Sequence, residues 1–343
     1  MLTQAIENWL KQALEIDTLS YIPVNGGANN LGFIIKNSEK RAFLKCFDPT
    51  NASTQYKQLN EFTFSQVLYN SGITNIPAPI AINRQECASL FSFIDGCTVD
   101  KSSPNAISAA VDFLANVNQS TINKDKLNTA SESAFSLFEF ANIVTNRLKK
   151  FNYIKTHDTY INTQLNSSLS QIKERFELTT KALPVQWQEV IKETIVSPSD
   201  FGFHNALQLN NDYYFIDFEY AGIDSSWKLF TDIFAQPEIP IDLRYAPDFL
   251  ASAIFKPLLY QPQNLLRVYE LTLLKWCLIM LNEFLPEVQA RRIFSWNKSS
   301  AEISNQQDLL KQAQLKQLKK CNDYFKNIPL KIEALSKVLR EIS

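Results

Sequence analysis

The chain has 343 residues and a mass of 39.3 kDa, and 45% of the residues are hydrophobic, so it can bury a large core and is long enough for two lobes or domains. Its 34 basic and 35 acidic residues give a net charge of -1 with no long run of one sign, which disfavours binding to nucleic acid. The five cysteines are scattered without a C-x-x-C pair, so we expect free thiols in a reducing cytoplasm and no zinc cluster or disulfide framework.

The first 14 residues are predicted to form an amphipathic helix rather than a signal peptide, because Glu7 and Asn8 interrupt the apolar run that a signal peptide requires. The most apolar stretch, residues 271–281, contains Lys275 and is shorter than the roughly 20 residues that span a bilayer. We therefore expect a buried helix there and no membrane insertion. The sequence makes no prediction of the oligomeric state.

The next part of the chain, up to residue 94, is predicted to contain short strands around one longer helix. The expected strands are 21–24, 31–36, 41–47, 78–83 and 88–94, and the expected helix is 51–72, which closes on Gly72. The first three strands are separated by turn-like "NGGANN" and "NSEK", which indicates an antiparallel meander.

From Pro104 onward the pattern becomes helical. The expected helices are 104–119, 134–151, 158–195 with a break near Pro184, 241–257, 262–284 and much of 302–341. A strand pair is expected near 206–218, and the polar segment 120–133 is expected to be a mobile surface loop. This order predicts an α+β fold with a small antiparallel-sheet lobe, residues 1–94, and a mostly helical lobe, residues 95–343.

Lys45 lies in a strand whose two faces are both apolar. An unpaired buried charge is very costly, so this cation needs an anion. Glu61 is the candidate, because it shares a helix face with Phe64 and Leu68 and should also point inward. The pair could serve only to close a core, or it could belong to a site.

Asp217 is a second charge in an apolar strand, "YYFIDF". Pairing this strand with "ALQL" through the turn near 210–212 brings Asp217 close to Asn205; a three-residue loop sets them opposite each other, and a two-residue loop shifts them by one. Their hard oxygen atoms are ligands of the kind that Mg²⁺ takes together with waters and phosphates.

Asp200 lies five residues before Asn205, in a segment where Gly202 permits an unusual backbone angle. Asp-x-x-x-x-Asn is the spacing of a kinase catalytic loop, in which the aspartate accepts the proton of the attacking hydroxyl and the asparagine holds Mg²⁺. The spacing alone is weak evidence. The order Lys45, Glu61, Asp200 with Asn205, then Asp217 argues against a chance match.

From about residue 20 to 235 the chain resembles the aminoglycoside phosphotransferase and choline kinase group of small-molecule kinases. The resemblance is carried by "GGANNLGFII", "FLKCF", "NEFTF", "SLFSFIDG", "SDFGFHNAL" and "YYFIDFEYAG". It implies the two-lobed protein-kinase-like fold. It also implies transfer of the γ-phosphoryl group of ATP or GTP to a hydroxyl of a small molecule, such as an amino sugar, a sugar, choline or another amino alcohol.

The same resemblance assigns roles to residues. Those around the nucleotide are Gly26, Gly27 and Asn30 in the phosphate-covering loop, Lys45 on the α and β phosphates with Glu61 holding it, and Ser92, Phe93 and Ile94 beside the adenine. Asn205 and Asp217 would hold Mg²⁺, and Asp200 would be the catalytic base. Glu219 and Asp224 would contact the acceptor.

Other side chains of this region keep two interpretations. Asp232 is expected to tie the catalytic loop by hydrogen bonding. Tyr220, Trp227 and Trp276 could enclose a quaternary ammonium group, but packing inside the helical lobe is the favoured explanation.

The sequence departs from the family's usual pattern around Asp200. The family usually has histidines two residues before and two after the catalytic aspartate, where this chain has Pro198 and Gly202. His204 is therefore expected to brace the loop, and His157 to lie on the surface. Two alternatives stay open: a nucleotide-binding pseudokinase, and a protein kinase. Asp-Phe-Glu at residues 217–219 and the absence of an Ala-Pro-Glu segment argue against the latter.

Overall fold

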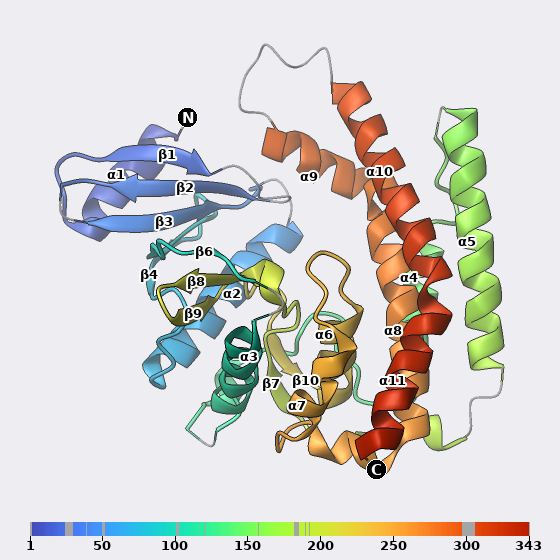
Figure 1. Ribbon diagram of the computed structural model, residues 1–343. Helices are drawn as coiled ribbons and strands as arrows, with labels where there is room; N and C mark the ends of the chain where they lie inside the picture. Colours follow the sequence, from blue (N-terminus) through green and yellow to red (C-terminus); the bar gives the residue numbers. More distant parts are fainter. Residues whose placement is uncertain are drawn as a thin grey trace.

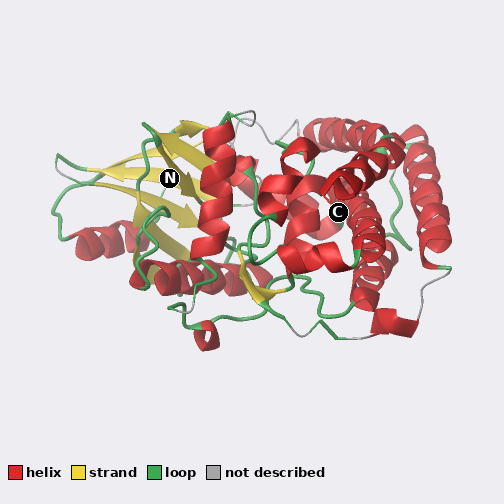
Figure 2. Ribbon diagram, turned by 60° about the horizontal axis from the view of Figure 1, so that its bottom comes forward, coloured by secondary structure: helices red, strands yellow, loops and turns green. Residues whose placement is uncertain are grey.

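The computed structural model describes residues 2–24, 30–38, 40–49, 52–100, 103–119, 121–156, 158–181, 185–188, 190–191, 193–296 and 306–342. Most strands lie at one end of the molecule and most helices at the other (Figure 2). The predicted α+β fold, with a small sheet lobe and a larger helical lobe, is confirmed.

The small lobe is a five-stranded antiparallel sheet in the order β1-β2-β3-β5-β4. Its strands are β1 (Ser20–Val24), β2 (Leu31–Lys36), β3 (Arg41–Cys46), β4 (Pro79–Asn83) and β5 (Ala88–Ser92). Helix α1 (Gln4–Leu14) begins after Thr3, whose side chain caps it, and packs Ile6, Leu10 and Leu14 into the same apolar cluster as the sheet (Figure 1). The expected strands and both expected helices of this lobe are present.

Helix α2 (Ala52–Asn70) connects β3 to β4 and contacts both lobes. Its Phe64, Val67 and Leu68 are buried in the core of the helical lobe, and the rings of Phe64 and Phe218 have centroids 5.2 Å apart. The helix therefore links the sheet to the segment that follows Asp217.

The helical lobe is arranged around α8 (Pro262–Met280), which packs against α4, α5, α6, α10 and α11 (Figure 1). Its helices besides α8 are α3 (Pro104–Asn116), α4 (Leu137–Lys149), α5 (Thr159–Thr180), α6 (Ser226–Ala235), α7 (Ala246–Leu250), α9 (Pro286–Trp296), α10 (Gln306–Lys326) and α11 (Ile328–Ile342). The apolar residues of 271–281 are buried in α8 as expected, and none of the described helices has the length and apolar character needed to cross a membrane.

Short strands complete this lobe next to the sheet. β6 (Cys97–Thr98), β8 (Ala206–Leu209) and β9 (Asp212–Phe215) form one small sheet, and β7 (Ile195–Ser197) pairs with β10 (Gly222–Asp224). Of these, only the β8–β9 hairpin was predicted. All five cysteines are free thiols, as predicted.

Three predictions of secondary structure were wrong in part. The helix expected over 158–195 ends at Thr180, and Ile195 belongs to β7. The helix expected over 241–257 is replaced by α7 and two 3₁₀ turns, since Pro247 and Pro257 each lack the N–H that a longer helix needs. The helix expected over 302–341 is divided into α10 and α11 at Asn327.

The polar segment 120–133 is not merely a surface loop. The amide of Ala130 donates to the Ile223 carbonyl (2.9 Å), and that of Ser131 donates to the Tyr220 carbonyl (3.0 Å). Ile122 and Ala130 are buried. The segment therefore packs against the chain that follows Asp217.

Candidate active site

The β8–β9 hairpin places Asn205 beside Asp217. Leu209 pairs with Asp212, so the loop has two residues, and the Ile216 amide donates to the Asn205 carbonyl at 3.0 Å. Asn205 is thus opposite the residue before Asp217, which is the shifted register that a two-residue loop implies. Asp217 has a positive φ of 67°, a conformation uncommon for a residue other than glycine.

The catalytic-loop candidate, residues 198–205, bends back on itself just before the hairpin. The Asn205 side-chain amide donates to the Asp200 carbonyl at 2.9 Å, and His204 Nε2 lies 3.2 Å from Asp200 Oδ1. The Phe201 ring packs against the rings of Phe113 and Phe215, with centroids 5.8 and 5.0 Å away. The aromatic core therefore anchors this loop, and His204 contacts Asp200 directly.

Three carboxylates surround the Lys45 ammonium. Its ammonium lies 2.7 Å from Glu61 Oε2, 2.7 Å from Asp217 Oδ1 and 3.8 Å from Glu219 Oε2. The predicted ion pair with Glu61 is present, and Asp217 joins it from the other lobe. Burial lowers the pKa of Lys45, but the carboxylates of Asp217, Glu61 and Glu219 outweigh it and raise that pKa, so Lys45 is a cation.

The carboxylates around Lys45 respond to their burial. Burial raises the pKa of Glu61 to about 7 despite Lys45. Burial also raises the pKa of Asp217, with Glu219 and Asp200 adding to the effect and Lys45 opposing it. Asp200 and Asp217 both line the cavity described below.

Glu219 lies between both lobes rather than at an open substrate surface. It is 4% exposed, and its carboxylate accepts from Lys57 of α2 (3.1 Å) and from the Asn30 amide (3.1 Å). Burial tends to raise the pKa of Glu219, but Lys45 and Lys57 lower it to about 2. Sequence analysis did not identify Lys57, although its position four residues before Glu61 places it on the same face of α2.

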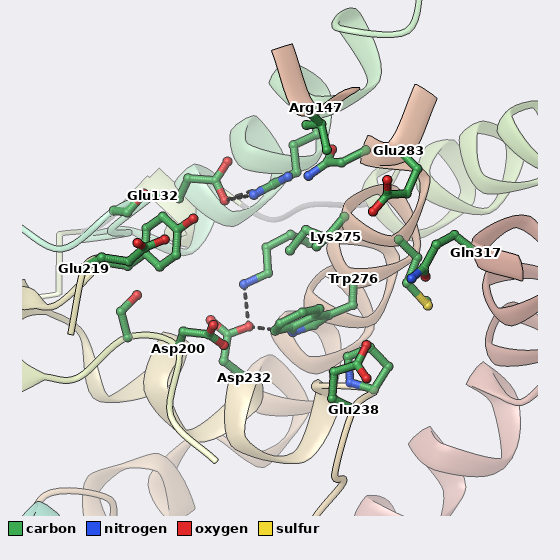
Figure 3. A pocket seen from close by; sticks show the side chains of 18 of the residues that line it. Glu132, Arg147, Asp200, Glu219, Asp232, Glu238, Lys275, Trp276, Glu283 and Gln317 are labelled. Carbon is green, nitrogen blue, oxygen red and sulfur yellow. Dashed lines mark hydrogen bonds and ion pairs between the residues drawn. The ribbon is translucent and has the colours of Figure 1, made fainter. Parts of the chain in front are cut away.

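A cavity of about 340 Å³ opens beside these groups, at the side of α8 (Figure 3). Asp200, Asp217 and Glu219 form its wall on the hairpin side, and residues of α8, α9 and α10 and of the 3₁₀ turn Leu281–Phe284 form the opposite wall. The cavity therefore lies directly beside Asp200.

Three further acidic side chains that line the cavity are paired with basic ones. Arg147 donates to Glu132 at 2.5 Å, Lys275 donates to Asp232, and Arg292 donates to Glu283 (Figure 3). The Trp276 indole also donates to Asp232, at 2.9 Å. Within the described part of the chain, Asp232 makes no hydrogen bond to residues 198–200 and is connected to the catalytic-loop candidate through Lys228, which lies 3.6 Å from its Oδ2.

Asp224 does not lie at this cavity, contrary to expectation. It is fully buried, its carboxylate is 3.0 Å from the Lys228 ammonium, and it accepts from the amides of Ser225 and Ala134. A fully buried and bonded carboxylate cannot contact a substrate. The expectation that Asp224 contacts the acceptor is therefore wrong.

Gly26, Gly27 and His157 are outside the described residues. Ser92 ends β5, where its amide donates to the Ala78 carbonyl, and Phe93 and Ile94 follow in the connection to β6. An adenine contact at Ser92, Phe93 and Ile94 stays a prediction.

Asn205 and Asp217 supply oxygen donors of the type that Mg²⁺ prefers. Among the described residues no three His, Cys, Asp or Glu side chains are arranged to hold a metal. This fits Mg²⁺ in nucleotide sites, which is usually bound by one or two protein oxygens with phosphates and waters. The side chain of Asp217 is 41% exposed and is therefore accessible to a metal and a nucleotide.

No protein-family model and no curated protein matches the sequence. Solved structures do match over nearly the whole chain. A spectinomycin phosphotransferase in complex with ADP and spectinomycin has a TM-score of 0.60 and 14% identity, covering 98% of this chain and 99% of that one. This chain has the fold of a small-molecule kinase.

Two further matches agree with this fold. The ternary complex of streptomycin, ATP and APH(2″)-IIa has a TM-score of 0.56 and 15% identity, with coverage of 93% and 99%. A choline/ethanolamine kinase family protein from Mesorhizobium loti has a TM-score of 0.53 and 13% identity, with coverage of 97% and 99%. The two-lobed protein-kinase-like fold expected from the sequence is therefore confirmed.

Proposed function

We propose that this protein is a kinase that transfers the γ-phosphoryl group of ATP to a hydroxyl group of a small molecule. The observation that carries the proposal is the contact of Lys45 of the sheet with Asp217, which lines the same cavity as Asp200. These segments are far apart in sequence, and phosphoryl transfer needs a cation, metal ligands and a base in this proximity. GTP is the alternative nucleotide.

In this proposal each residue has one task. Lys45, oriented by Glu61, binds the α and β phosphates. Asn205 and Asp217 hold Mg²⁺, which neutralises developing charge on the phosphate oxygens. Asp200 orients the acceptor hydroxyl and takes its proton. Residues 1–94 form the lobe that covers the nucleotide, and residues 95–343 form the lobe that carries the base, the metal ligands and the acceptor cavity.

The charge balance of the cavity bears on the acceptor. Glu219 and Asp232 are each paired with two lysines, and Glu132 and Glu283 with one arginine each. A multiply cationic acceptor would therefore have to compete with internal ion pairs. This favours neutral polyhydroxyl acceptors, such as sugars, over amino sugars and choline.

An acceptor panel tests this ranking. We expect glucose-like neutral acceptors to stimulate ATP turnover more than glucosamine, which has the same carbon skeleton and one positive charge, or choline. Stronger stimulation by the cationic compounds would reverse the ranking while leaving the kinase proposal intact. Phosphorylation of peptides alone would favour a protein kinase.

Two substitutions test the assigned roles. Asp200→Asn should reduce transfer by a factor of about 10³ or more while sparing MgATP binding, because it removes only the base. Asp217→Ala should weaken MgATP binding itself, measured by calorimetry. Asp212→Asn, at the exposed hairpin turn, is the matched control. Equal and mild effects of the first two variants would contradict the roles, and nucleotide binding without any transfer would favour a pseudokinase.

A further inference from the structure

Lys228 is a buried lysine to which the proposed chemistry gives no task. It lies in the first turn of α6, is 3% exposed, and its ammonium is 3.0 Å from Asp224 Oδ2 and 3.6 Å from Asp232 Oδ2. A third contact leads out of this cluster: the ammonium donates to Ser199 Oγ at 3.1 Å. Ser199 directly precedes Asp200.

Ser199 has an unusual backbone conformation. Its φ is 66°, in the left-handed region that residues other than glycine, asparagine and aspartate seldom adopt. Its amide donates to Ser197 Oγ at 3.0 Å, and its carbonyl accepts from the Phe201 amide at 3.0 Å. Unfavourable conformations of this kind persist only where surrounding contacts enforce them, and they concentrate at functional sites.

We propose that Lys228 is a positioning residue, whose ammonium holds Ser199 in this conformation and thereby presents Asp200 to the cavity. The position two residues before Asp200, where the resembling family usually has a histidine, is occupied by Pro198. The loop is then supported from two sides, by Lys228 at the Ser199 hydroxyl and by His204 at the Asp200 carboxylate.

Lys228 is suited to this task because it stays charged and immobile. Burial lowers the pKa of Lys228, but the carboxylates of Asp224 and Asp232 outweigh it and raise that pKa above its ordinary value. Asp232 is itself held by Lys275 and Trp276 of α8. Contacts thus run from α8 through Asp232 and Lys228 to the catalytic-loop candidate.

A lysine that only neutralised Asp224 and Asp232 would be structural. Replacing Lys228 cannot separate the two possibilities, because Lys228→Met would leave the buried Asp224 carboxylate without its ion pair and threaten the fold. Ser199→Ala removes just the loop hydroxyl that accepts from the Lys228 ammonium, and it leaves the ion pairs of Lys228 intact. Ser225→Ala is the matched control, since Ser225 Oγ accepts from the Lys228 main-chain amide and caps α6 without touching the loop.

The test is amide hydrogen exchange, measured by mass spectrometry on the full chain without any acceptor. Ser199→Ala should speed exchange of the amides in 200–205 about tenfold, which corresponds to the loss of one hydrogen bond to a charged group. It should leave exchange in α6 unchanged. Ser225→Ala should loosen the start of α6 and leave 200–205 unchanged. Unchanged exchange at 200–205 in Ser199→Ala, or equal loosening there in both variants, would overturn the proposal.

Catalysis provides a second readout, which rests on the proposed kinase activity. With the best acceptor of the panel, Ser199→Ala should lower kcat about tenfold and change the KM for ATP much less, because Lys45, Glu61 and Asp217 lie outside the loop. A loosened loop with unchanged kcat would overturn the catalytic part. Failure of the kinase proposal itself would be seen separately, as an absence of transfer by the unmutated protein, and the exchange experiment does not depend on it.

Discussion

At the scale of single residues, Glu219 owes its properties to partners that are distant in sequence. From its place two residues after Asp217 we expected it to face an acceptor. It instead accepts from Lys57 and Asn30, more than 150 residues earlier, and lies 3.8 Å from Lys45. Its charge therefore bridges the two lobes, although it also borders the cavity.

The lowered pKa of Glu219 predicts a pH-dependent contribution to stability. A carboxyl group whose pKa falls from 4.5 to about 2 on folding stabilises the protein by about 3 kcal/mol above pH 4.5, and this is lost as the pH falls toward 2. Glu219→Gln should therefore lower the free energy of unfolding by about that amount at pH 7, measured with urea. The difference from the unmutated protein should shrink between pH 4.5 and pH 3; a constant difference would contradict the assignment.

Residue-level prediction succeeded where a charge conflicted with its local pattern. Lys45 and Asp217 each lie in an apolar strand, so the sequence alone requires a partner for them. Lys57 and Lys228 sit in helices, where a lysine can equally well face solvent, and nothing local distinguishes the two cases. Their burial depends on which elements pack over them, which the sequence pattern does not specify.

At the scale of elements, α2 presents one face to the segment after Asp217. Lys57, Asn60, Glu61 and Phe64 follow each other at helical spacing on this face, and the Asn60 amide donates to the Ala221 carbonyl at 2.8 Å. Because this face carries the partner of Lys45, its contacts also fix where Lys45 points.

The segment 128–131 and β10 form a second contact between elements, and Gly222 makes it possible. A Cβ at Gly222 would lie 2.3 Å from the Asn128 carbonyl oxygen and 2.7 Å from the Ala130 amide nitrogen, both backbone atoms. Gly222→Ala should therefore separate the two segments and break the two backbone hydrogen bonds of Ile223. We expect a loss of at least about 3 kcal/mol in the free energy of unfolding.

The matched control for this loss is Gly72→Ala at the end of α2. A Cβ there meets no heavy atom within 4 Å, and only the positive φ of 89° is unfavourable. The cost should be about 1 kcal/mol. If the two alanine variants unfold at the same urea concentration, the close approach at Gly222 is not what stabilises this contact.

The elements predicted correctly are those with strong local signals. The five sheet strands alternate or lie between turn-like residues, and α8 has an apolar face bounded by prolines. The segment 120–133 was misread because its docking uses main-chain amides, which polar side chains do not reveal. Residues 241–257 contain enough apolar residues for a helix, but the prolines divide them.

At the scale of the whole molecule, the sheet and the helical lobe have separate hydrophobic cores. One cluster joins α1 to the strands, and the other extends from α2 through all the helices of the large lobe. Helix α2 links the two, with Phe62 against Phe91 of β5 and Phe64 against Phe218. Polar bridges add to this link, namely Lys45 with Asp217 and Asn30 with Glu219. Such bridges also surround the proposed nucleotide site, so nucleotide binding and the relative position of the lobes should be coupled.

The pair Lys57 and Glu219 provides the means to measure this bridge. In a double-mutant cycle of Lys57→Ala and Glu219→Ala, followed by urea unfolding, we expect a coupling energy of about 2 kcal/mol or more, because both groups are largely buried. The exposed pair Lys173 and Glu177 on α5 should give less than about 0.5 kcal/mol. Additive effects of the two substitutions would mean that Glu219 is stabilised mainly by Lys45, and that α2 is held to the large lobe by its apolar residues rather than by this ion pair.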